Sequence, residues 1–146
     1  MEKNKKKYGL LVAVALCMCL LGGFLANLAQ TDFGKVTKKT ILFESNSGHT
    51  ISADVLIPNE AGEENPLPAI VWAHGGNANK ERSDNFQIEW ARRGYVVVSF
   101  DLYGHGESEV LNDTEWFDNG RGLYDTVQYV ATLPYVDADR IAVSGH

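Results

Sequence analysis

The sequence predicts a doubly wound, mostly parallel α/β sheet preceded by one N-terminal transmembrane helix. Two observations predict the sheet: solid apolar runs recur beyond residue 68, and segments with helical periodicity separate them. A third observation, an uncharged apolar stretch directly behind a lysine cluster, predicts the membrane helix. The composition, with 45% hydrophobic and 22% charged residues among 146, is that of an ordinary globular protein and excludes a disordered chain.

The N-terminal segment has the layout of a signal-anchor. Residues 1–7 form a basic n-region with a net charge of +3, and residues 8–31 contain no charged side chain. A bilayer-spanning helix needs about 20 apolar residues, whereas the apolar part of a cleaved signal peptide usually has about 7–15. We therefore expect residues 8–28 to span the cell membrane once, with the N-terminus cytoplasmic and the rest extracytoplasmic. Signal-peptide cleavage followed by secretion is the alternative.

Charge and cysteine content exclude several functions. Residues 8–146 carry a net charge of −9, which disfavours nucleic acid as a partner. Both cysteines, Cys17 and Cys19, lie in the apolar stretch, so the remainder has no disulfide, no cysteine metal site and no thiol nucleophile. No other metal-ligand spacing is visible, and we expect neither a metal nor a cofactor.

The first part of the globular region predicts an antiparallel hairpin. After a polar linker over residues 29–39, residues 39–44 and 50–57 have strand character, with turn-forming residues 45–49 between them. Alternation of Ile51, Ala53, Val55 and Ile57 with less apolar neighbours is typical of a half-buried strand. Residues 58–68 are acidic and contain prolines, which indicates a surface loop.

Three apolar runs then alternate with two helical segments. Residues 69–73, 95–100 and 140–144 are expected to be buried strands of a parallel sheet. Phe86 and Trp90 lie one turn apart in a first helix that ends near Gly94. A second helix carries Leu123 and Val127 on one face. This order predicts a doubly wound sheet with right-handed crossovers.

The residues with chemical potential follow these strands, where active sites of open α/β sheets lie. The first group is His74, Gly75, Gly76 and Asn77, directly after the strand at 69–73. Glycines leave backbone N–H groups unshielded, so that a negatively charged oxygen can approach them. A glycine-rich turn that requires positive φ is the structural alternative.

The second group follows the strand at 95–100. Gly104 and Gly106 permit a tight reversal, while Asp101 and Ser108 have the side chains to hold it through backbone hydrogen bonds. His105 is a candidate base, but the pattern favours a role in bracing the loop over one in catalysis.

The third group is Ser144, Gly145 and His146, after the strand at 140–144. A strand followed by Gly-His is how a nucleophile elbow of the type G-x-S-x-G begins, in which serine occupies a strained turn between strand and helix. The serine of such an elbow would stand next after His146.

Residues 70–76, 94–108 and 135–146 together make the chain similar to the α/β-hydrolase superfamily, in that family's order and spacing. The resemblance covers most of residues 40–146 and is nearest to the dienelactone-hydrolase, acyl-esterase and Xaa-Pro-dipeptidyl-peptidase-like branches. It implies a serine hydrolase acting through an acyl-enzyme, on a mostly parallel eight-stranded sheet of which this chain supplies the first five strands.

The resemblance also assigns roles to residues. It implies that Gly76, or less readily Asn77, donates its N–H to an oxyanion hole, and that the second N–H belongs to the residue after the nucleophile. The acid and histidine of the triad would come later still. Four polar residues match no triad position in the family: Asp101, His105, Asp125 and His146.

From this resemblance we expect residues 40–146 to be a partial hydrolase domain, truncated at the nucleophile elbow and inactive alone. The full-length protein would be a membrane-anchored hydrolase of a small ester or peptide-like substrate, its oligomeric state open. Trp116 and Phe117 could line the substrate pocket or pack beneath their loop. The alternative among enzymes is a dehalogenase or peroxidase-like member of the superfamily. The alternative outside enzymes is a non-catalytic membrane-tethered α/β binding module or a remnant.

Overall fold

The computed structural model describes residues 2–82, 84–111 and 120–146, in two units that divide between Gly34 and Lys35. The first unit is helix α1 (Glu2–Gln30) and a short turn. Within the described part of the chain, α1 is the one helix long and apolar enough to cross a bilayer, over Lys6–Gln30. A signal sequence meets the same criterion, so length and composition alone do not separate an anchor from a cleaved segment.

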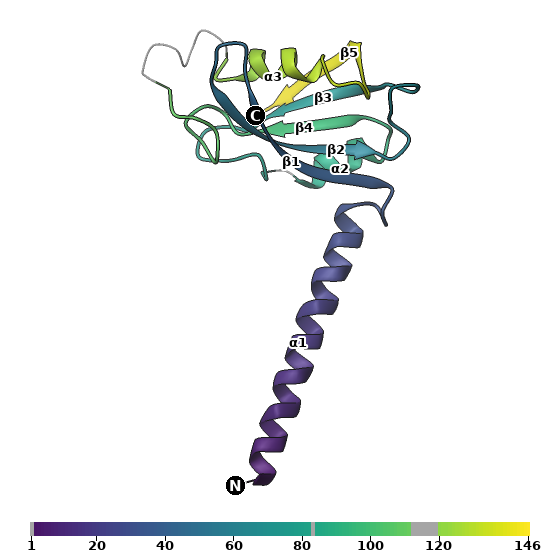
Figure 1. Cartoon of the computed structure of the whole chain (residues 1–146), viewed down its shortest axis with the longest axis vertical. Coiled ribbons are helices and arrows are strands. Elements are labelled where there is room, and N and C mark those ends of the chain that lie inside the picture. The colour runs from purple at the N-terminus through teal and green to yellow at the C-terminus, as the bar shows by residue number, and fades with distance from the viewer. Residues whose placement is uncertain (1, 83, 112–119) are drawn as a thin grey trace. The chain divides into compact units, whose positions relative to one another are not determined.

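The second unit is a mixed five-stranded sheet with the strand order β1-β2-β4-β3-β5 (Figure 1). Its strands are β1 (Val36–Glu44), β2 (Thr50–Pro58), β3 (Leu67–Ala73), β4 (Val96–Phe100) and β5 (Val136–Gly145). The β1–β2 hairpin and the β2–β4 pair are antiparallel, whereas β3 pairs parallel with both β4 and β5. The predicted α/β fold is confirmed.

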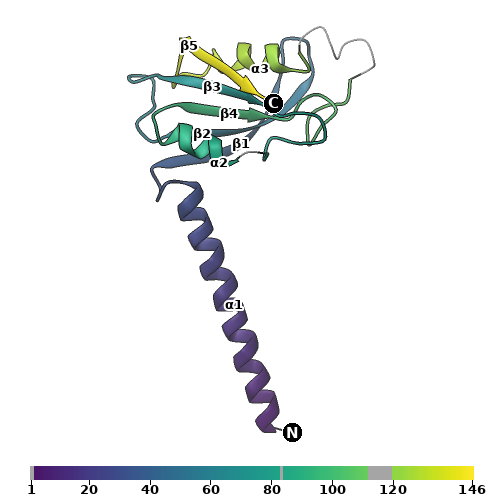
Figure 2. The same cartoon turned by 180° about the vertical axis from the view of Figure 1, so that it is seen from behind.

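Helices α2 (Asp84–Ala91) and α3 (Leu123–Val130) cover opposite faces of this sheet (Figures 1 and 2). Because side chains alternate along a strand, neighbouring residues of β4 enter different cores. Val97 packs with Ala91 of α2, while Val96 and Val98 pack in the larger cluster that contains Val130 of α3. The uninterrupted valine run of β4 therefore serves two hydrophobic cores at once.

One expectation about the hairpin was wrong, and the linker before it has different bounds. The linker is shorter than residues 29–39, because α1 continues to Gln30 and β1 begins at Val36. Strand β2 is buried on both faces, not half-buried, since Ser52, Asp54 and Leu56 are enclosed as well. The two buried polar side chains of β2 each have a partner: Ser52 Oγ donates a hydrogen bond to Glu107 at 3.0 Å, and Asp54 forms an ion pair with Lys38 at 2.9 Å.

The third parallel strand, β5, also departs from the prediction. Its residues 140–144 were expected to be buried, yet Val143 is 52% exposed and Ile141 only partly covered. The physical reason is that β5 is an edge strand, paired only with β3 among the described strands. Only its first residue, Val136, is fully enclosed in the core beneath α3.

Candidate active site

The carboxyl ends of the three parallel strands meet at one edge of the sheet. Ala73 of β3 stands in register with Phe100 of β4 and with Gly145 of β5. The residue that follows each of them is His74, Asp101 or His146, so the three groups singled out from the sequence begin at the same level. The His146 N–H donates to the Ala73 carbonyl oxygen at 3.2 Å and fixes the end of β5 beside β3.

Two glycines permit this close approach of backbones. A Cβ on Gly145 would lie 2.6 Å from the Ala73 carbonyl oxygen, a distance at which the two strands would have to separate. A Cβ on Gly75 would lie 3.1 Å from the His146 ring nitrogen Nδ1. Glycine at position 145 is therefore required by the backbone contact between the β3 and β5 ends, whereas a side chain at position 75 would have to displace His146 slightly.

The N–H groups of Gly76 and Asn77 are accessible at this edge. Both residues are exposed, and among the described residues neither N–H donates to a protein acceptor. Asn77 has φ +58°, a left-handed conformation that asparagine tolerates better than most residues. The loop borders a cavity of about 190 Å³. Its lining comprises Trp72, His74, Gly75, Gly76, Ala78, Arg82 and His146.

His74 is a buried support for this loop. The Leu102 N–H donates to His74 Nε2 at 3.1 Å, so the proton of the neutral ring resides on Nδ1, which lies 2.7 Å from the Gly75 carbonyl oxygen and donates to it. Burial lowers the pKa of His74, with the nearby His105 ring adding to the effect against the Gly75 hydrogen bond. Its two nitrogens thus link the β3 and β4 loops, and neither is free for proton transfer.

The Asp101 side chain also links the loops that follow β3 and β4. Its side chain is fully buried and accepts hydrogen bonds from the Lys80 N–H at 2.7 Å and the Glu107 N–H at 3.0 Å. A Cβ on Gly106 would lie 2.2 Å from the Asp101 carboxylate, and Gly106 has φ +50°. Ser108 Oγ donates to the Asp101 carbonyl oxygen at 2.6 Å and closes the reversal.

Lys80 was not singled out from the sequence, yet it neutralises this carboxylate. Its Nζ is 2.8 Å from both Asp101 and Glu107. Burial opposes the charged form of Lys80, but the two carboxylates outweigh it and raise the pKa of the ammonium group. The hydrogen bond from Lys80 in turn lowers the pKa of Glu107. The available signal was a lysine three residues after Gly-Gly-Asn together with an aspartate directly after the next parallel strand.

The backbone between the loop and α2 is fixed by a buried amide. Gln87 is 1% exposed, and its Nε2 lies 3.2 Å from the carbonyl oxygens of both Lys80 and Arg82. Ser99 Oγ of β4 donates to the Lys80 carbonyl oxygen at 2.6 Å. The loop that carries Gly76 and Asn77 is thus fastened at its far end to β4 and α2.

The remaining candidates have structural surroundings or lie outside the described residues. Gly104 has φ +76° in the turn, and His105 Nδ1 is 3.2 Å from the Tyr103 carbonyl oxygen. Asp125 is buried in α3, where it accepts a hydrogen bond from the Tyr103 hydroxyl at 2.9 Å. Trp116 and Phe117 belong to residues 112–119, which the structure does not describe. Among the residues that the structure does describe, no three His, Cys, Asp or Glu side chains cluster to hold a metal ion.

Comparison with known proteins places this arrangement among hydrolases. Residues 47–146 match the family described as X-Pro dipeptidyl-peptidase (S15 family). An uncharacterized protein of Pseudomonas aeruginosa, PA2218, is 32% identical over 114 residues, which cover 76% of this chain and 30% of that protein. The uncharacterized protein YcjY of Escherichia coli is 27% identical over 110 residues, 72% of this chain and 36% of its own. The chain thus spans about a third of the length of these relatives.

Solved structures agree with the sequence comparison. The crystal structure of PA2218 matches 75% of this chain and 35% of its own with a TM-score of 0.64. Acetyl xylan esterase 1 from a Thermoanaerobacterium species matches 76% of this chain and 40% of its own, with a TM-score of 0.58 and 23% identity. The second likeness is one of fold alone.

Proposed function

Because the chain belongs to the X-Pro dipeptidyl-peptidase (S15) family of α/β hydrolases, we propose that the protein is a serine hydrolase that cleaves an ester or a peptide bond through an acyl-enzyme. Family and fold support a hydrolase in the coarse sense. The nature of the nucleophile, the substrate and the fate of the acyl group belong to the proposal.

One observation carries the proposal: Gly76 and Asn77 are exposed, their N–H groups have no described acceptor, and Gly76 lines the cavity that His146 borders at the end of β5. A tetrahedral intermediate of acyl transfer carries a negatively charged oxygen, and N–H groups without an intramolecular acceptor are the donors that stabilise it. Loss of one such donor typically costs a factor of about 10²–10³ in rate. In this proposal Gly76 is the first donor, and Asn77 the alternative.

The proposal places the other catalytic groups after His146. The serine would follow in the turn after β5, its own neighbour would give the second oxyanion N–H, and the acid and histidine would come from later sequence. The 146-residue chain would then be inactive alone. That the described chain corresponds to about a third of PA2218 and YcjY accords with this arrangement.

We further propose that α1 anchors the enzyme in the cell membrane, with the lysine cluster cytoplasmic and the hydrolase domain outside. Mass spectrometry of the N-terminus of protein purified from its membrane or medium tests this proposal. A mature chain that keeps its first residues supports an anchor, whereas a chain that begins beyond residue 20 identifies a cleaved signal peptide.

The enzymatic proposal is tested with a fluorophosphonate probe, which labels only an activated serine. The full-length gene product should be labelled when folded and unlabelled after heat denaturation, and the 146-residue chain should stay unlabelled. Substitution of the serine after Gly145-His146 by alanine should abolish labelling. A folded full-length protein that takes up no probe would refute the serine-hydrolase proposal and favour a membrane-tethered binding module.

A further inference from the structure

Arg82 forms no ion pair with any residue that the structure describes. Three other arginines are paired with carboxylates: Arg92 and Arg93 with Glu89, and Arg140 with Asp137. Among the described residues no carboxylate lies within ion-pair distance of the Arg82 guanidinium. Arg82 is exposed, so its guanidinium is available to a negatively charged ligand from solvent.

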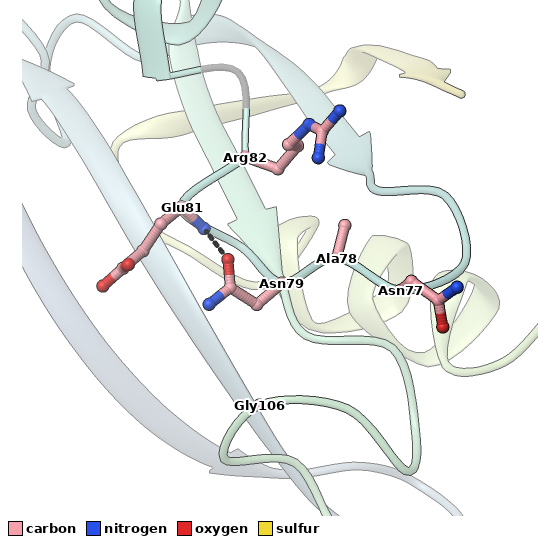
Figure 3. A pocket seen from close by; sticks show the side chains of 6 residues that line it. All are labelled: Asn77, Ala78, Asn79, Glu81, Arg82 and Gly106. Carbon is pink, nitrogen blue, oxygen red and sulfur yellow. Dashed lines mark hydrogen bonds between the residues drawn. The ribbon is translucent and has the colours of Figure 1, made fainter.

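Arg82 lies where a substrate would bind. Its side chain lines the cavity of about 190 Å³ that Gly75, Gly76 and His146 also border. It also lines a more open hollow of about 510 Å³, shared with Asn77 and Gly106. Figure 3 shows this hollow, with the Arg82 side chain directed away from that of Glu81. The neighbouring carboxylate of Glu81 therefore does not compete for the guanidinium.

The backbone that carries Arg82 is held from both sides. The Arg82 N–H donates to the Asn79 carbonyl oxygen at 3.0 Å, and the buried Gln87 side chain donates to the Arg82 carbonyl oxygen at 3.2 Å. Because the main chain is already ordered, ligand binding has to order only the side chain, which reduces the entropic cost of recognition.

We propose that Arg82 binds a carboxylate of the substrate, so that the enzyme acts on esters or amides whose acyl part carries a negative charge near the scissile carbonyl. This inference rests on the serine hydrolase proposed above. A guanidinium presents a planar fork of N–H donors that matches a carboxylate in two parallel hydrogen bonds, which sets both charge and orientation. The Gly76 N–H would meet the reacting carbonyl oxygen while Arg82 holds the far end of the acyl group.

The test compares two esters of equal chain length on the full-length protein: the 4-nitrophenyl half-ester of succinate and neutral 4-nitrophenyl butyrate. Substitution Arg82→Gln should raise KM for the succinate ester about 10–100-fold, the range of a charged hydrogen bond, and leave KM for butyrate unchanged. Arg82→Lys should recover part of the loss. Arg93→Gln, which removes an exposed arginine of the segment after α2, should change neither KM.

The outcomes separate this inference from the function on which it rests. If butyrate is cleaved but Arg82→Gln leaves the KM values of both esters unchanged, or raises them equally, the role of Arg82 is refuted and the hydrolase stands. If neither ester is cleaved by a protein that also refuses the fluorophosphonate, the hydrolase proposal fails. Calorimetric titration with free succinate then still tests the role of Arg82. Succinate that binds the wild type but not Arg82→Gln supports the carboxylate site. Succinate that binds neither protein, or binds both equally, overturns it.

Discussion

Replacement of Lys80 by methionine should loosen the two loops at the edge of the sheet that carries the candidate active site. Methionine keeps the length and most of the apolar stem of lysine but removes the ammonium group that lies 2.8 Å from Asp101 and from Glu107. Asp101 is fully buried, so water cannot take the place of the lost partner without opening the structure. The backbone N–H groups of Lys80 and Glu107 still donate hydrogen bonds to the Asp101 carboxylate, which reduces the destabilisation but does not neutralise the negative charge.

The expected magnitude follows from which partner is buried. Removing one member of a buried ion pair costs about 3–5 kcal/mol, because the other charge is left uncompensated. The matched control is Glu107→Gln, since Glu107 also contacts Lys80 but is 66% exposed. Exposed ion pairs contribute about 0–1 kcal/mol, so this variant should differ little from the wild type.

Thermal unfolding followed by tryptophan fluorescence, on the full-length protein in detergent, measures the difference. A 3–5 kcal/mol loss corresponds to a fall in Tm of roughly 4–8 °C for a protein of about 300–400 residues, the length of the relatives, at an unfolding entropy of about 2.1 cal/mol/K per residue. Glu107→Gln should shift Tm by about 2 °C or less. If Lys80→Met lowers Tm no more than Glu107→Gln does, the ion pair with Asp101 does not hold the loops and the argument is wrong.

Two further predictions concern the same edge. Burial lowers the pKa of His74 in the folded protein, so as the pH falls the imidazole is protonated first in the unfolded chain. Stability should therefore fall as the pH drops below 6.5, the ordinary pKa of histidine. His74→Gln should flatten that part of a plot of Tm against pH. Gly106→Ala should lower the free energy of unfolding by more than about 2 kcal/mol, because the new Cβ would clash with the Asp101 carboxylate and the backbone there is left-handed. Gly76→Ala is the control: no atom lies within 4 Å of its Cβ, so this variant should unfold like the wild type. Equal Tm values for the two alanine variants would contradict this reading of the loops.

The sequence was most informative about the sheet. The apolar runs at β3 and β4 are solid because both faces of those strands are covered, and that pattern is local and easily recognised. The burial of β2 was missed because it depends on partners from elsewhere in the chain. Ser52 and Asp54 look solvent-facing until Glu107 and Lys38 are brought to them by the fold.

At the candidate site, the sequence predicted where the polar residues lie but not which side chains pair with one another. The groups after β3, β4 and β5 were found because parallel strands end at a common edge. The pairing of Lys80 with Asp101 was not found, since one among many lysines is distinguished only by the hydrogen-bond distance to a carboxylate 21 residues away. Arg82 was missed for a related reason: its distinguishing property is the lack of a described carboxylate partner, which no local pattern encodes.

The strand order has a consequence for how the chain acquires its structure during synthesis. The hairpin β1–β2 and strand β3 do not touch as neighbours in the sheet; β4 lies between them and pairs with both. As the chain is made from its N-terminus, the β2 and β3 edges that meet β4 stay open until residue 100 has emerged, and open apolar edges invite wrong pairing. Five residues, Val96–Phe100, thus join the two halves of the sheet, and the earlier strands have to stay apart from other chains until those five have been made.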